Sequence, residues 1–428
     1  MADDRRAAPA DGMTAADRTL RNLTWLNFAI AGMQAGFGPF VSVRLTASGW
    51  NPAAIGIVLS AGSVASVLAQ VPSGIIIDQF GARRGLASTA VVASMAALFM
   101  LSLVPGFALV LAAEIVQGGA GVGLSLAVAA ITLCVSRQAH LGERLGRNVR
   151  AAAIGAAGGS ALLGAVGSWL SPSAAFVLAA AFGLPALLAL RGIAVGDIVT
   201  ADRRTGHHTA PPPHARRSRP VPAHRLLRDR GMQGLLAVAA LFQLANASLL
   251  PLAATAYTHE AGSRAGLITA AAVIGPQLLA AALSPYIGRA ANMHGRRPVL
   301  MLGLAAVPLR AVGFAIHAAI GPMLALQLLD GVSAATIGVL VPLIAADVTH
   351  RSGRFNFALG TAGLAGALGA SLGTTLSGGI AVHAGLPVAF LSLAVAGLGA
   401  ILVAWAWLPE TAHLPASLPA ASERGVVA

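Results

Sequence analysis

The chain has 428 residues, of which 56% are hydrophobic and only 10% are charged. Soluble globular proteins carry about 25% charged residues, so this composition excludes an ordinary cytosolic protein. All 28 basic residues are arginines and the net charge is +13, which could indicate a nucleic-acid partner. The arginines lie instead in short breaks between apolar runs, as in membrane proteins, and we expect no nucleic acid. Cys134 is the single cysteine, so no intrachain disulfide can form.

Apolar runs recur along the whole chain, and each is long enough to cross a hydrocarbon core of about 30 Å as a helix. Six spans are predicted in the first part, at 21–45, 51–77, 85–104, 107–135, 151–170 and 174–190. Six more are predicted after a basic linker at 191–231, at 232–257, 265–288, 298–317, 321–346, 356–381 and 387–408. Polar tails are predicted at 1–20 and 409–428. The sequence thus predicts an all-α membrane protein with twelve transmembrane helices in two six-helix bundles, 21–190 and 232–408.

An internal repeat supports two related halves. The charged break after the second span contains Gly74, Asp78, Gly81, Arg83 and Arg84, and counting 214 positions onward from four of these gives Gly288, Asn292, Gly295 and Arg297. Gln34 in the first span matches Asn246 in the seventh at an offset of 212. In the fourth span, Glu114 and Gln117 match Gln327 and Asp330 at an offset of 213. The chain is therefore predicted to be a doubled, pseudo-symmetric unit.

The arginines also predict an orientation. If the N-terminus is cytosolic, 25 of the 28 arginines fall in cytosolic tails and loops, with Arg44 and Arg264 outside and Arg310 inside a span. Cytosolic loops of membrane proteins carry an excess of basic residues. We therefore expect a multi-pass protein of the inner (plasma) membrane with both termini and the linker in the cytosol.

The chain resembles the major facilitator superfamily over residues 20–410, because it has two six-span halves, a basic linker and the G-x3-D-x2-G-x-R-R break. Its twelve spans suggest the drug and small-molecule exporters of that family. Glu114, Gln117 and Gly118 resemble the family's motif in span four, and the glycine series of span five resembles its antiporter pattern. The resemblance implies alternating access, in which two bundles rock about a central cavity lined by spans one, four, seven and ten.

Asp78 is a candidate gating residue together with the rest of its loop. A carboxylate at the C-terminal end of span two is disfavoured by the helix dipole, so it needs a partner. Arg83, Arg84 and the free N–H groups at the start of span eleven are the candidates. A contact with span eleven would hold the cytosolic side closed, whereas the alternative is a plain solvated turn.

Glu114 and Asp330 are the only carboxylates well inside predicted spans, and a charge at membrane depth is costly. Either side chain could couple transport to protons if it is protonated in one state and ionised in another. For Asp330 the alternative is a permanent ion pair with Arg310, which lies at a similar depth. Asn27, Gln34, Gln117, Gln243 and Asn246 are candidate cavity residues, although amides within spans can also simply join helices.

We expect a secondary transporter of a small organic molecule, with protons as the coupling ion and efflux by antiport as the direction. Proton-coupled uptake of a metabolite or metal chelate is the alternative, and a non-transporting membrane receptor or scaffold is a distant one. The lysine-free chain has no nucleotide-binding P-loop and no His-Glu-x-x-His zinc signature, so an enzyme is not expected. Linker histidines match no metal-ligand spacing. No metal, no cofactor and a monomer are expected.

Overall fold

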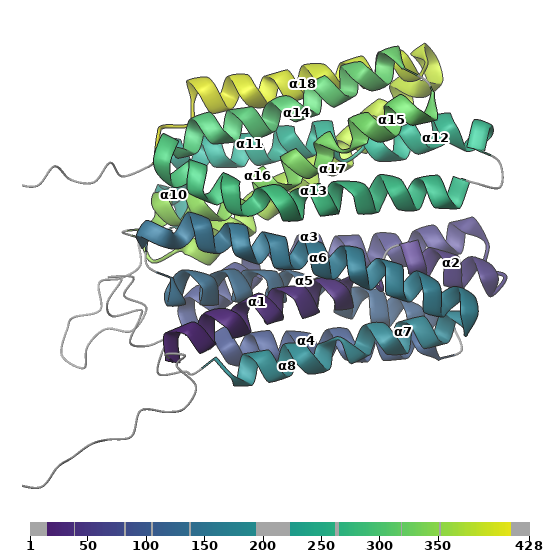
Figure 1. Ribbon diagram of the computed structural model, residues 1–428, viewed down its shortest axis with the longest axis horizontal. Helices are drawn as coiled ribbons and strands as arrows, with labels where there is room; N and C mark the ends of the chain where they lie inside the picture. The colour runs from purple at the N-terminus through teal and green to yellow at the C-terminus, as the bar shows by residue number, and fades with distance from the viewer. Residues whose placement is uncertain are drawn as a thin grey trace, which may run out of the picture.

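The computed structural model describes residues 15–37, 39–80, 83–103, 106–136, 138–193, 223–261, 265–317, 319–350 and 352–411. Within these ranges the structure is helical and contains no β-strand. Figure 1 shows two bundles of nearly parallel helices side by side, formed by the first and second parts of the chain. We call them the N half (residues 15–193) and the C half (residues 223–411).

The N half contains α1 (Ala15–Gln34), α2 (Pro39–Ala47), α3 (Pro52–Phe80), α4 (Arg83–Ser102), α5 (Phe107–Val135), a 3-10 turn (Gln138–His140), α6 (Leu141–Trp169), α7 (Pro172–Ala181) and α8 (Gly183–Arg191). The C half contains α10 (Ala223–Leu227), α11 (Arg230–Asn246), α12 (Leu249–Ala261), α13 (Ala265–His294), α14 (Arg296–Ile316), α15 (Ile320–Gln327), α16 (Leu329–Thr349), α17 (Phe355–Ala384) and α18 (Leu386–Ala406). The order of long helices therefore repeats from one half to the other.

Eleven segments of the described chain are long and apolar enough to cross a membrane, one fewer than predicted. The segment that does not qualify is the first: α1 has 20 residues but carries Asp17, Arg18 and Arg21, and the apolar α2, which begins at Pro39, has only nine residues. Proline lacks an N–H and disfavours helical backbone in the residue before it, so it can begin a helix but interrupts one that precedes it. The predicted first span is thus two helices in succession, which follow one another along the N half (Figure 1).

Two predicted boundaries move. α1 begins at Ala15, so residues 15–20 of the predicted tail are helical, with Asp17 in the first turn where the helix dipole favours an acid. In the predicted linker, α10 occupies Ala223–Leu227, and α11 begins at Arg230 because Asp229 caps it by accepting a hydrogen bond from the Met232 N–H at 3.1 Å. The remaining linker (194–222) and tail (1–14, 412–428) residues lie outside the described ranges.

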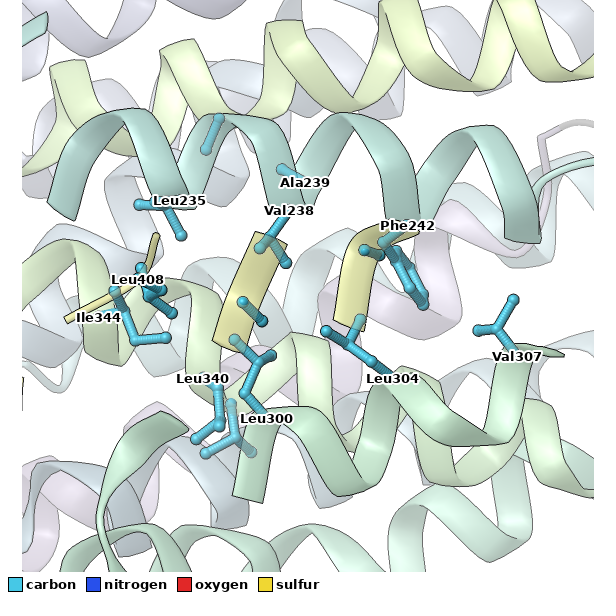
Figure 2. Close-up of a cluster of buried hydrophobic side chains, with 14 of the residues drawn as sticks. Leu235, Val238, Ala239, Phe242, Leu300, Leu304, Val307, Leu340, Ile344 and Leu408 are labelled. Carbon is cyan, nitrogen blue, oxygen red and sulfur yellow. The ribbon is translucent and has the colours of Figure 1, made fainter. Parts of the chain in front are cut away.

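Each half has its own apolar core, as expected for amphipathic helices that bury one face against their neighbours. In the C half, Leu235, Val238 and Phe242 on α11 point toward Leu300 and Leu304 on α14 (Figure 2). The N half has a core built mainly on α1, α4, α5 and α7, while Leu133, Leu141 and Leu145 of this half belong to the C-half cluster. Most of each bundle is therefore packed against itself, and the halves share an apolar contact at α5 and α6.

The two halves meet near one end of the molecule, which we call the terminal end because α1 begins and α18 finishes there (Figure 1). On α6, Gly142 approaches the backbone of Gly288 on α13, a proximity that only small residues permit. A small cluster of buried alanines continues this contact further along, with Ala153 from the N half against Ala280 and Ala335 from the C half. α2 and α12 lie at the opposite end.

Candidate functional site

Interrupted helices place polar residues midway between the two ends. α1 ends at Gln34 and α11 ends at Asn246, so these matched residues occupy equivalent helix ends in the two halves. A third break separates α15 from α16 and leaves Asp330 in the first turn of α16. Helix ends have free N–H and C=O groups, and interrupted membrane helices are a recurring means of building polar binding sites at mid-membrane depth.

In the C half, three of the candidate residues form one cluster. The Arg310 side chain is 1% exposed, and its Nη1 lies 2.6 Å from Oδ1 of Asp330. Its Nη2 donates a hydrogen bond to Oδ1 of Asn246 at 2.5 Å. The Asp330 side chain keeps 27% of its surface exposed, and its place at the start of α16 suits a carboxylate. The cluster is a buried cation held by α11, α14 and α16, with one partly accessible anion.

In the N half, the matching positions are neutral. A Cβ added at Gly121 of α5 would lie 3.4 Å from the Gln117 side-chain nitrogen and 4.0 Å from that of Gln34, so the two amides gather on one side of α5. Gln34 and Gln117 are the repeat partners of Asn246 and Asp330. The residue 213 positions before Arg310 is the buried Ala97. The repeat therefore has amides in one half and an ion pair in the other.

Glu114 lies one turn before Gln117 on α5 but contacts a different helix. Its side chain faces α3, where Gly62 leaves room for it: a Cβ at Gly62 would lie 2.9 Å from the carboxylate Oε2. The residue is 7% exposed, and within the described chain its Oε1 has no hydrogen-bond partner. Its repeat partner Gln327 is also buried, and both polar atoms of that amide likewise find no partner among the described residues. Glu114 is thus a buried acid held between α3 and α5.

The other two predicted cavity amides join neither group. Asn27 donates a hydrogen bond to the Leu23 carbonyl of its own helix at 2.8 Å. Gln243 packs against Gly366 of α17, since a Cβ there would lie 3.2 Å from its Cγ. Both contacts are of the kind that joins or stabilises helices. No group of three or more His, Cys, Asp or Glu side chains within the described ranges could hold a metal ion.

The Asp78 side chain, at the terminal end of the N half, accepts hydrogen bonds from the C half. Its Oδ1 accepts hydrogen bonds from the backbone N–H of Asn356 at 3.1 Å and from the Asn356 amide at 2.8 Å, and its Oδ2 accepts one from the Phe357 N–H at 2.9 Å. These N–H groups belong to the first turn of α17, which has no helical partner for them. Gly74, one turn earlier, allows the Asn356 backbone to approach α3.

The arginines of the same loop make contacts within the N half. Arg83 is buried and donates to the Cys134 sulfur on α5 at 2.5 Å, and Arg84 donates to the Ile193 carbonyl at 3.2 Å. Gly81 lies outside the described residues. These arginine contacts connect α4 with the ends of α5 and α8.

The second loop combines a contact between halves with contacts inside the C half. Asn292 donates to the Ala139 carbonyl of the N half at 3.2 Å, beside the approach of Gly288 to Gly142. Gly295 has φ +96°, a left-handed conformation that favours glycine, and α14 starts directly after it. Arg297 donates to the Trp405 carbonyl at 3.2 Å. The loop therefore touches both halves at the terminal end.

Sequence reasoning missed the partners that hold α14. The Glu410 carboxylate accepts hydrogen bonds from the N–H groups of Arg296 at 2.7 Å and Arg297 at 3.1 Å, as Asp78 does at α17. The Arg296 side chain forms a buried ion pair with Asp347 at 3.1 Å. One signal was available in the internal repeat, because Asp347 lies 213 positions after Cys134, the partner of Arg83, and Arg296 lies 213 positions after Arg83.

Two packed bundles that meet at one end, with interrupted helices and buried polar groups between the ends, define a multi-span membrane transporter. The family model of the Major Facilitator Superfamily matches residues 23–275 and 234–427. The uncharacterized MFS-type transporter Rv2456c of Mycobacterium tuberculosis H37Rv is 33% identical over 398 residues, covering 92% of this chain and 94% of the relative. The MFS-type transporter MT2531 of strain CDC 1551 has the same identity and coverage.

Solved structures show the same fold. FucP, an MFS transporter in the outward conformation, superposes with a TM-score of 0.65 at 15% identity, covering 92% of this chain and 99% of FucP. The human organic anion transporter MFSD10 gives a TM-score of 0.67 at 16% identity, covering 92% of this chain and 100% of MFSD10. The chain belongs to the major facilitator superfamily. It is therefore a transporter with a small-molecule substrate, not an enzyme, and the predicted fold class is confirmed.

Proposed function

We propose that the chain is a proton-coupled secondary transporter that exports a small organic molecule, and that Glu114 carries the proton. The observation behind this proposal is the buried Glu114 carboxyl group, which lacks a hydrogen-bond partner for Oε1 within the described chain. A buried ionised carboxylate without a partner is costly, so a group in this place gains from binding a proton whenever its surroundings are closed. Release follows when the halves move and water reaches it.

Asp330 has a different role in this proposal. Its carboxylate is already neutralised by Arg310, and Arg310 is also bound to Asn246. We assign this cluster, with Gln34 and Gln117 of the other half, to the binding of polar groups on the substrate. The Asp330 side chain is partly exposed, so a substrate can reach its carboxylate. A substrate with a cationic or hydrogen-bonding group would suit this combination of one anion and several amides.

The gate in this proposal is the contact of Asp78 with the start of α17. We place the terminal end in the cytosol of a cell whose inner membrane holds the protein as a monomer, because the arginine-rich loops lie at that end. The hydrogen bonds from Asn356 and Phe357 then close the cytosolic side, with the opposite side left for access from outside. Their breaking and remaking accompanies each transport cycle.

The test uses inside-out membrane vesicles that contain the protein, energised to an acidic interior and offered a panel of amphipathic dyes and cationic compounds. Export by proton antiport predicts accumulation inside the vesicles, collapse of accumulation with a protonophore, and its loss in Glu114→Gln. Substrate counterflow without a proton gradient should survive this substitution. Glu143→Gln is the matched control, because Glu143 is a half-buried acid at the terminal end that already pairs with Arg147 at 2.8 Å.

The same vesicles decide between the alternatives. Uptake by proton symport would move substrate out of acid-interior vesicles together with protons; the fucose:proton symporter FucP, which shares the fold, is a protein of this kind. A non-transporting receptor would bind compounds without gradient-dependent accumulation. Accumulation that ignores the gradient and persists in Glu114→Gln combined with Asp330→Asn would overturn proton coupling.

A further inference from the structure

A cavity of about 480 Å³ lies between the halves near the terminal end, outside the proposed transport site. Its lining includes Thr24 of α1, Glu143, Arg147, Arg150 and Ile154 of α6, and Arg289 of α13. Three of these six side chains are guanidinium groups, and they come from both halves. The cavity is thus a basic site that exists only where α6 and α13 lie close together.

The positive charge of this cavity is not compensated by its own acid. Glu143 pairs with Arg147 at 2.8 Å, which leaves Arg150 and Arg289 without an anionic partner in the part of the chain that the structure describes. Arg289 lies over the Tyr286 ring at 4.9 Å, a contact that orients the guanidinium but does not neutralise it. Behind the lining, the buried Arg144 donates to the Thr24 hydroxyl at 2.9 Å and adds a further positive charge.

The position of these arginines indicates the ligand. Arg150 and Arg289 are exposed, and Arg150 directly precedes the span predicted from residue 151. Arginines next to a span end lie near the level of the lipid headgroups. Guanidinium groups bind phosphate oxygens in a bidentate manner, and the exposed Ile154 one turn further along provides apolar surface. We propose that this cavity binds the phosphate of an anionic phospholipid, with Arg150 and Arg289 on the phosphate and an acyl chain along Ile154.

Such a lipid would also bias the transport cycle. It contacts α6 of one half and α13 of the other, so it binds best when the terminal end is closed, and it stabilises that state by its difference in affinity between states. This second consequence rests on the alternating access of the proposed function. The binding site itself does not, since it needs only the geometry of the closed terminal end.

The experiment measures lipid binding to the full-length protein in detergent micelles by native mass spectrometry, with phosphatidylglycerol and with phosphatidylcholine as the neutral comparison. We expect selective retention of phosphatidylglycerol by the wild type. The double variant Arg150→Gln, Arg289→Gln should bind it roughly 30-fold more weakly, from the attraction of two arginines to anionic lipid. The control double variant Arg228→Gln, Arg230→Gln removes two exposed arginines of the C half that do not line the cavity, and should bind as the wild type does.

Other outcomes have definite meanings. Equal binding by the Arg150, Arg289 variant and the control variant would overturn the site, as would equal retention of phosphatidylcholine. Competition by millimolar glycerol phosphate would overturn the lipid assignment in favour of a soluble phosphate. The Glu114→Gln variant should keep its lipid affinity, so a failure of proton coupling and a failure of this site are distinguishable. A normal melting temperature of the double variant shows that lost binding is not lost folding.

Discussion

Arg310 is the largest fully buried side chain in the described part of the chain, so its pairing dominates the local energetics. Removal of one member of a buried ion pair leaves an uncompensated charge and costs about 3–5 kcal/mol, whereas neutralisation of both members can cost little. We therefore expect Asp330→Asn to lower the thermal stability of the purified protein strongly. The double variant Arg310→Gln, Asp330→Asn should recover most of that loss in a denaturation series.

An ion pair on the surface of the protein serves as the control for this buried pair. Arg147 and Glu143 lie 2.8 Å apart, but the arginine side chain is 58% exposed, and such pairs contribute about 0–1 kcal/mol. Glu143→Gln should therefore leave the melting temperature nearly unchanged. A double variant at Arg310 and Asp330 no more stable than Asp330→Asn alone would contradict the ion pair as the origin of the effect.

The cluster around Arg310 could be predicted in part from the sequence. Similar depths on consecutive spans gave the pairing of Arg310 with Asp330 as one of two alternatives, and Asn246 was a separate cavity candidate. That Arg310, Asp330 and Asn246 form one cluster was not predictable, because the directions of their side chains depend on the helix breaks after Asn246 and after Gln327. Hydropathy does not register such breaks, since the residues on both sides are equally apolar.

Two carboxylates at the terminal end satisfy the free N–H groups of helices, but they connect different elements. Asp78 joins α3 of the N half to α17 of the C half, whereas Glu410 joins the end of α18 to α14 inside the C half. Hydrogen bonds to a charged group contribute about 1.5–3 kcal/mol. Asp78→Asn should therefore shift the population toward a state open at the terminal end by about tenfold or more.

Spin labels at the exposed positions Gln79 and Met293, in a Cys134→Ser background, report this shift as a longer distance across the terminal end. Glu410→Gln is the matched control, because it removes the same type of bond within one half. It should lower the melting temperature without changing the distance distribution. Equal distances in Asp78→Asn and the wild type would show that Asp78 does not hold the halves together.

The close approach of α6 and α13 gives a second prediction for these elements. A Cβ at Gly142 would lie 2.6 Å from the Gly288 carbonyl oxygen and 2.7 Å from Oδ1 of Asn292, and backbone cannot yield as a side chain can. Gly142→Val should therefore prevent closure of the terminal end and lengthen the same spin-label distance. Gly158→Val on the same helix meets nothing within 4 Å and should leave the distance unchanged. Wild-type distances in both variants would contradict tight α6–α13 contact.

At the scale of the whole molecule, the pattern of apolar runs and the internal repeat were enough to predict two bundles, because span length and helical backbone are dictated by the membrane. The interruptions between α1 and α2, α11 and α12, and α15 and α16 were not predicted. Pro39 and Pro251 stand close to two of them, whereas the third has no proline in the residues at the break. Its position depends on packing against neighbouring helices, which a single sequence does not reveal.

The orientation of the whole molecule can be tested independently of transport. Arg144, Arg147, Arg289, Arg296 and Arg297 all lie toward the terminal end, whereas Arg44 is the arginine of α2 at the other end. Because basic residues remain on the cytosolic side, the terminal end should be inaccessible from outside the cell. Two single-cysteine variants in a Cys134→Ser background test this: Ser48→Cys, at an exposed position beside α2, and Met293→Cys at the terminal end, where the wild-type side chain is 78% exposed. A membrane-impermeant maleimide applied to intact cells should label the first variant but not the second. Permeabilised cells should label both, and labelling of Met293→Cys in intact cells would reverse the orientation and with it the direction assigned to the gate.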